Sequence, residues 1–174
     1  LIFPMFEFEF PGSMDDLQEF EKELLMHFGY QSPFPEGNYE DLCRKYGVDE
    51  LTHEHEKQLC AEYGPVFFLK NFPERTSPFF NMERNNKTGL AKKIDVIMSG
   101  METIGSAERS CNVEEMRKRF YTISDGQYAK MLFAKFGKAR VEKELDDFFN
   151  YDFVQRVGAG IGVTRLISSL RAVG

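Results

Sequence analysis

The sequence predicts a single α+β domain, and three observations support this fold class. The 174 residues lie within the range of one domain and are enough to bury a core. Hydrophobic residues make up 42% of the chain, with 18 phenylalanines and no tryptophan. Segments with the period of two that is typical of strands are interspersed with segments that have the 3.6-residue period of helices.

The first two elements have clear start and stop signals. Residues 2–10 alternate phenylalanine and glutamate, which predicts a half-buried strand, and a Pro-Gly pair then turns the chain. Ser13, with Asp16 three residues later, predicts a capped helix start, and Gly29 predicts the end of this helix. The N-terminal part is therefore expected to form one strand followed by one helix.

The rest of the chain predicts further strands and helices, without an internal repeat or a low-complexity tract. Apolar runs predict strands at about 65–70, 91–99 and 101–109. Periodic apolar positions predict helices at about 38–46, 52–63, 113–120, 126–136 and 139–149. A final strand and helix close the domain.

A glycine-rich segment leads into this last helix. Gly158, Gly160 and Gly162 alternate with small or apolar residues, and Arg165 follows on the first helical turn. Without a Cβ, a glycine backbone can approach a ligand closely, while a guanidinium can stack on an aromatic ring or pair with phosphate. These four residues are candidates for binding a flat, anionic ligand. On the glycines alone, a glycine-rich strand packed against a helix explains the pattern equally well.

A second segment carries charged residues on two predicted strands. Asp95 lies seven residues before Glu102, and Arg109 lies seven residues after it, with a Ser-Gly turn between the strands. Together with the glycine-rich segment, this pattern resembles the catalytic core of class II aminoacyl-tRNA synthetases of the aspartate/asparagine/lysine subgroup. It also resembles the aspartate–ammonia ligases built on that core. The resemblance implies a class II synthetase-type antiparallel β-sheet flanked by helices.

The resemblance extends over the whole chain. Residues 64–80 are similar to a family element in which a strand is followed by Phe-Pro, a loop and Pro-Phe. Residues 3–9 are similar to the second strand of motif 2. Residues 1–174 are therefore expected to be part of a catalytic domain that starts within motif 2 and ends after motif 3. A small helical insertion is expected at about 31–63. Motif 1, which builds the family's homodimer interface, and the motif 2 arginine are absent from this sequence, so a complete active site is not expected from it alone.

The chemistry implied by the resemblance is activation of a carboxylate by ATP, with Mg²⁺, to give an acyl-adenylate. Asp95 and Glu102 are the candidate Mg²⁺ ligands, although Asp95 is equally suited to accept hydrogen bonds from a turn. Arg165 would stack on adenine or hold the distal phosphate. Arg109 would form a bidentate pair with a carboxylate of aspartate, its alternative being an ion pair with Glu108 or Glu102.

Three departures from the synthetase pattern favour the ammonia-using relatives. Glu108 precedes Arg109, where the synthetases usually have an uncharged residue, and Thr164 precedes Arg165, where they usually have an acidic one. Residues 155–158 also lack the Pro-His-Gly type of sequence that commonly precedes motif 3 in the synthetases. Glu108 is a candidate to hold the substrate's ammonium group or to accept a proton from ammonia, unless it is a surface strand residue. The sequence therefore predicts asparagine synthesis from aspartate and ammonia. The alternatives are the catalytic domain of an aspartyl- or asparaginyl-tRNA synthetase, with tRNA as partner, and a non-catalytic paralogue.

Composition argues against several other classes. The net charge of −6 and the scattered basic residues leave no electrostatic footprint for nucleic acid. No apolar run reaches membrane-spanning length and no signal peptide is visible, so a cytoplasmic protein is expected. The three widely spaced cysteines are interpreted as reduced thiols. His53 and His55 lie two apart on a predicted helix, on nearly opposite faces, which argues against a metal site.

Overall fold

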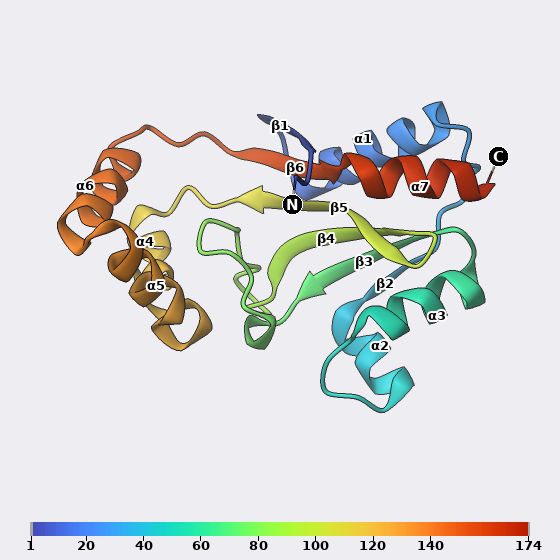
Figure 1. The fold of residues 1–174 in the computed structure, drawn as a ribbon, viewed down its shortest axis with the longest axis horizontal. Coiled ribbons are helices and arrows are strands. Elements are labelled where there is room, and N and C mark those ends of the chain that lie inside the picture. The colour runs from blue at the N-terminus through green and yellow to red at the C-terminus, as the bar shows by residue number, and fades with distance from the viewer. Residues whose placement is uncertain (1, 174) are drawn as a thin grey trace.

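A computed structural model describes residues 2–173 and contains one 6-stranded sheet with the order β1-β6-β5-β4-β3-β2 (Figure 1). The strands are β1 (Met5–Pro11), β2 (Glu36–Asn38), β3 (Val66–Phe72), β4 (Ala91–Met98), β5 (Met101–Arg109) and β6 (Arg156–Gly162). Neighbouring strands are antiparallel except for β2 and β3, which are parallel. The sheet confirms the α+β class and the class II synthetase-type antiparallel arrangement.

Two pairs of helices cover the sheet. Helices α1 (Met14–His27) and α7 (Val163–Val173) pack on one face, which we call the α1/α7 face, around a core that includes Ile94, Val96 and Ile104. Helices α2 (Tyr39–Tyr46) and α3 (His53–Tyr63) cover the β3 and β4 half of the opposite face, which we call the site face. Helix α3 reaches β5 at Glu102, whereas no helix within residues 2–173 covers β1 and β6 on the site face (Figure 1).

A third group of helices lies beyond one end of the sheet (Figure 1). It consists of α4 (Val113–Thr122), a 3₁₀ turn at Ile123–Gly126, α5 (Gln127–Phe136) and α6 (Lys138–Phe149). Another 3₁₀ turn, Glu74–Thr76, lies between β3 and β4. These helices enclose a separate aromatic-rich cluster around Phe80, Phe120 and Phe149. Among residues 2–173, no helix is long and apolar enough to cross a bilayer.

Local sequence signals explain how the first elements form. Ser13 caps α1 as predicted: its backbone N–H donates to the Asp16 carboxylate at 2.7 Å, and its hydroxyl accepts from the Asp16 N–H at 3.5 Å. In β1, the alternation places Phe8 and Phe10 against Phe20 of α1. The intervening glutamates therefore point to the site face.

The region predicted as a small helical insertion, about 31–63, contains α2 and α3 but also the edge strand β2. No signal in the sequence predicts this strand, because Glu-Gly-Asn is too short to show a period of two and has low strand propensity. Pairing with β3 stabilises it: Gly37 lies opposite Leu69, and a Cβ at Gly37 would be 3.1 Å from the Phe67 ring. Tertiary contacts thus decide the conformation of this segment.

Candidate functional site

A depression of about 400 Å³ lies on the uncovered part of the site face. Its floor contains Gly105, Gly160 and Gly162 from β5 and β6. Charged side chains surround this floor, namely Glu7, Lys93, Glu102, Arg109 and Arg165. Apolar and small side chains complete the lining, among them Phe3, Met5, Phe79, Met82 and Thr103. We call this the site depression.

Side chains of residues 3–9, in and just before β1, lie across the glycines. A Cβ at Gly160 would be 2.7 Å from Met5 Cε, and one at Gly162 would be 3.1 Å from the Phe3 ring. A Cβ at Gly158 would be 2.6 Å from Glu9 Cγ. Gly160 and Gly162 line the depression, whereas Gly158 lies beneath the Glu9 side chain; their role in binding stays a prediction.

Arg109 is oriented by a residue from the other end of the chain. Its Nε donates to Glu9 Oε1 at 3.0 Å, and Arg156 Nε donates to Glu9 Oε2 at 3.2 Å. The register brings them together, because Glu9 pairs with Gly158, which in turn pairs with Ala107. The ion pair expected as the alternative role of Arg109 thus exists, but its partner is Glu9 instead of Glu108 or Glu102.

Arg165 and Phe3 face each other across Gly162. The guanidinium carbon of Arg165 lies 5.4 Å from the centroid of the Phe3 ring, and Nη1 donates to the Glu102 carbonyl at 2.6 Å. Arg165 is otherwise exposed at the start of α7. An aromatic ring and a guanidinium plane at one edge of a depression are suited to stack on a flat heterocycle.

Asp95 and Glu102 meet over Gly105. A Cβ at Gly105 would be 2.9 Å from Glu102 Oε1 and 3.8 Å from Asp95 Oδ1. Asp95 is buried; its Oδ2 accepts from Lys93 Nζ at 2.5 Å, and its Oδ1 has no hydrogen-bond partner within the described chain. Burial raises the pKa of Asp95 to about 7, and the Glu102 charge acts in the same direction while Lys93 opposes it.

This pair of carboxylates fits Mg²⁺. An orphaned, buried carboxylate oxygen beside a second carboxylate supplies hard oxygen donors, and Mg²⁺ commonly takes one or two carboxylates together with water and substrate phosphates. Within residues 2–173, no cluster of 3 or more His, Cys, Asp or Glu side chains is arranged to hold a metal ion by itself. The pair would therefore hold Mg²⁺ only together with ligands from a bound nucleotide.

Glu108 lies apart from the other predicted site residues. It is buried on the α1/α7 face, where Oε2 accepts from the Met14 N–H at 3.1 Å and Oε1 pairs with Lys92 Nζ at 2.8 Å. Successive strand residues point to opposite faces, so Glu108 points away from the face that carries Arg109. The structure does not bring Glu108 to the site depression, and neither is it a surface residue.

Several residues that line or support the site were not among those predicted from the sequence, namely Phe3, Glu7, Glu9 and Lys93. The alternation in β1 contained a signal for two of them, because it places Glu7 and Glu9 on one face. Phe3 and Lys93 carried no local signal, since only the tertiary structure brings them to Arg165 and Asp95.

The chain matches the family model of class II tRNA synthetases (D, K and N) over residues 3–173. The chain belongs to this family. It is 29% identical over 166 residues to an aspartate–tRNA(Asp) ligase of Pyrobaculum aerophilum, covering 88% of the chain and 34% of that protein. It is 23% identical over 163 residues to an asparagine–tRNA ligase of Thermoplasma acidophilum, covering 87% of the chain and 35% of that protein. The chain thus spans about a third of the length of these class II synthetases.

Solved class II synthetases share the fold. The asparaginyl-tRNA synthetase of Entamoeba histolytica, in complex with asparaginyl-adenylate, aligns with a TM-score of 0.74 and 20% identity over 98% of this chain and 44% of that one. The aspartyl-tRNA synthetase of the same organism aligns with a TM-score of 0.70 and 18% identity over 97% of this chain and 40% of that one. These structures show that the chain has the class II synthetase fold.

Proposed function

We propose that the chain is the catalytic core of a ligase that activates aspartate or asparagine with ATP, forms an aminoacyl-adenylate and pyrophosphate, and transfers the amino acid to tRNA. The observation that supports this proposal is the convergence of Arg109, Arg165 and the Asp95–Glu102 pair on the site depression. Adenylation requires groups that orient two substrates and neutralise phosphate charge, and it does not require a protein nucleophile. The named relatives support tRNA as the acceptor.

ATP would bind at the edge formed by Phe3 and Arg165. The adenine ring would stack on the Phe3 ring and the Arg165 guanidinium, which already face each other. Asp95 and Glu102 would hold Mg²⁺ next to the phosphates. When bound, Mg²⁺ neutralises negative charge on the phosphates and favours departure of pyrophosphate.

The amino acid would bind at Arg109. Within the described residues, only Nε of this guanidinium makes a hydrogen bond, so both Nη groups are available for a carboxylate. Glu9 holds the guanidinium in place through the contact at Nε, and Arg156 shares the Glu9 charge. A fork of two donors is matched better by the side-chain carboxylate of aspartate than by the amide of asparagine, which favours aspartate as substrate.

Asparagine synthesis from ammonia is the second candidate. The observation that favours it is Thr164, which is exposed directly before Arg165 and leaves this position without an acidic group. Glu108, the residue that we expected to act on ammonia, points away from the site depression. We therefore place this reaction second. The expected homodimer and the cytoplasmic location stay predictions.

Amino-acid-dependent exchange of labelled pyrophosphate into ATP tests adenylation directly. We expect exchange with aspartate, less with asparagine and none with lysine. The acceptor is then identified by adding either tRNA or ammonium to aspartate and Mg-ATP. Charged tRNA without free asparagine is expected, whereas free asparagine formed without RNA would establish the second candidate.

A matched pair of arginine variants controls this experiment. Arg109→Lys should raise the aspartate concentration needed for exchange at least about tenfold, whereas Arg140→Lys should leave it unchanged, because Arg140 pairs with Glu144 on the exposed surface of α6. The experiment uses the full-length protein, because these 174 residues alone are not expected to form a complete active site. Absence of exchange with every amino acid in that folded protein would support the non-catalytic paralogue and refute the proposed function.

A further inference from the structure

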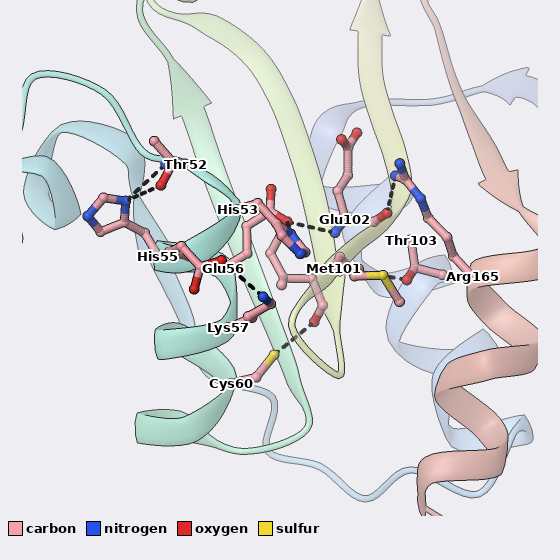
Figure 2. A network of polar contacts seen from close by, with 12 residues as sticks. Thr52, His53, His55, Glu56, Lys57, Cys60, Met101, Glu102, Thr103 and Arg165 are labelled. Atoms are coloured by element: carbon pink, nitrogen blue, oxygen red, sulfur yellow. Dashed lines mark hydrogen bonds and ion pairs between the residues drawn. The ribbon is translucent and has the colours of Figure 1, made fainter.

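The backbone of Glu102 is held on both sides by side chains of two different helices (Figure 2). Its N–H donates to Glu56 Oε2 of α3 at 3.2 Å, and its carbonyl accepts from Arg165 Nη1 of α7 at 2.6 Å. Two helices that are far apart in the sequence therefore fix the two peptide groups that flank the Glu102 Cα. The carboxylate of this same residue faces Asp95.

Glu102 lies at an irregular point of the sheet, where it needs such support. The pairing of β4 with β5 shifts between Val96↔Ile104 and Ile97↔Glu102, so that Thr103 is an extra residue on β5. A bulge interrupts the ladder of backbone hydrogen bonds and re-aims the neighbouring side chain. The direction of the Glu102 carboxylate therefore depends on how this short segment is fixed.

Glu56 is placed to fix it. Its side chain is 24% exposed and lies between the sheet and His53, whose Nδ1 is 3.3 Å from Glu56 Oε2. Glu54, two residues earlier on α3, has a side chain that is 78% exposed and pairs with Lys57. The two glutamates lie on the same helix and have the same side chain, but Glu56 bonds to the sheet at Glu102 whereas Glu54 points to solvent. Glu56 does not complete a metal-binding cluster with its acidic neighbours in the described chain.

We propose that Glu56 is a positioning residue for Glu102: by accepting the Glu102 N–H, it fixes the bulge and directs the Glu102 carboxylate toward Asp95. The role in catalysis rests on the proposed function. Because Arg165 bonds the carbonyl of the same residue, Glu56 and Arg165 together fix the Glu102 backbone on both sides of its Cα. The helix α3 thus supports the metal-binding pair without touching the substrate.

Two substitutions separate the hydrogen bond from the charge. Glu56→Gln keeps an oxygen acceptor and removes the charge, whereas Glu56→Met keeps the length of the side chain and removes the acceptor. Glu54→Met is the matched control on the exposed side of α3. Circular dichroism of each variant verifies that the protein is folded, and Glu56→Ala replaces Glu56→Met if the latter does not fold.

The first readout is hydrogen exchange of the Glu102 amide, measured without nucleotide or metal. Exchange should be at least about tenfold faster in Glu56→Met, because the hydrogen bond that protects the amide is lost, and unchanged in Glu56→Gln and Glu54→Met. Unchanged exchange in Glu56→Met would overturn the proposal. This readout is independent of whether the protein forms an adenylate.

The second readout is the Mg²⁺ dependence of pyrophosphate exchange. Glu56→Met should require several-fold more Mg²⁺ for half-maximal rate, with little change in the KM for the amino acid, while Glu56→Gln retains wild-type behaviour. If Glu56→Gln requires as much Mg²⁺ as Glu56→Met, the charge of Glu56 matters and it is a metal ligand instead. Failure of the proposed function would instead abolish exchange in the wild-type protein and leave the amide readout intact.

Discussion

Glu21 provides the sharpest prediction about stability. It lies on α1 with 0% of its surface exposed, and neither of its carboxylate oxygens has a hydrogen-bond partner in the described chain. Burial raises its pKa from 4.5 to about 8, and the Asp95 charge contributes in the same direction. The perturbation is Glu21→Gln, which keeps the shape of the protonated acid and cannot ionise.

The magnitude follows from proton linkage. The folded protein binds this proton more tightly than the unfolded chain, so the stability it contributes is complete below pH 4.5 and is lost as pH rises to about 8. Because each pKa unit corresponds to ~1.4 kcal/mol, ionising buried Glu21 costs up to about 5 kcal/mol of folding free energy. The variant should match the wild type near pH 4.5 and gain on it by roughly 1 kcal/mol per pH unit up to pH 8.

The assay is urea unfolding of both proteins at several pH values between 4.5 and 8.5. Far-UV circular dichroism reports the transition, since the chain has no tryptophan. A constant difference between the two proteins reflects the fit of the amide group, so the decisive quantity is the change of this difference with pH. Parallel stability curves across the whole pH range would refute the reasoning.

Three further predictions concern the site. Gly158→Ala should lower the free energy of unfolding by roughly 1–3 kcal/mol in thermal or urea melts, because the new Cβ would lie 2.6 Å from Glu9 Cγ; an unchanged melt would contradict the close packing. Arg165→Ala should weaken ATP binding at least about tenfold in calorimetry while the protein stays folded, and unchanged affinity would exclude the adenine contact. Arg109→Lys should weaken aspartate binding at least about tenfold and leave ATP binding intact, so that equal loss of both ligands would argue for a structural role.

Most elements could be predicted from the sequence because their signals are local. The Ser13 capping box, the alternation of β1 and the apolar runs of β4 and β5 depend only on neighbouring residues. The short strand β2 could not be predicted, because its conformation comes from pairing with β3. In the same way, no local pattern connects Arg109 to Glu9, which lies 100 residues away and is delivered by the register of β1, β6 and β5.

The outcome for Glu108 has a different cause. Glu108 was expected to hold the substrate's ammonium group or to accept a proton from ammonia. Adjacent residues of a strand point to opposite faces, so Glu108 and Arg109, which are neighbours on one predicted strand, do not reach the same site. The buried contacts of Glu108 with Met14 and Lys92 show that its carboxylate holds the start of α1 instead.

The extra residue at Thr103 determines which face of the sheet the side chains before it point to. Glu102 and Arg109 are separated by an odd number of positions, so in a regular strand they would point to opposite sides of the sheet. The bulge takes up one of these positions, so that Glu102 and Arg109 point to the same face of the sheet and both side chains reach the site depression. Removing one residue between the bulge and Arg109 would disrupt this match even though every functional side chain remained. The chemistry of the site thus depends on a count of residues as much as on their identity.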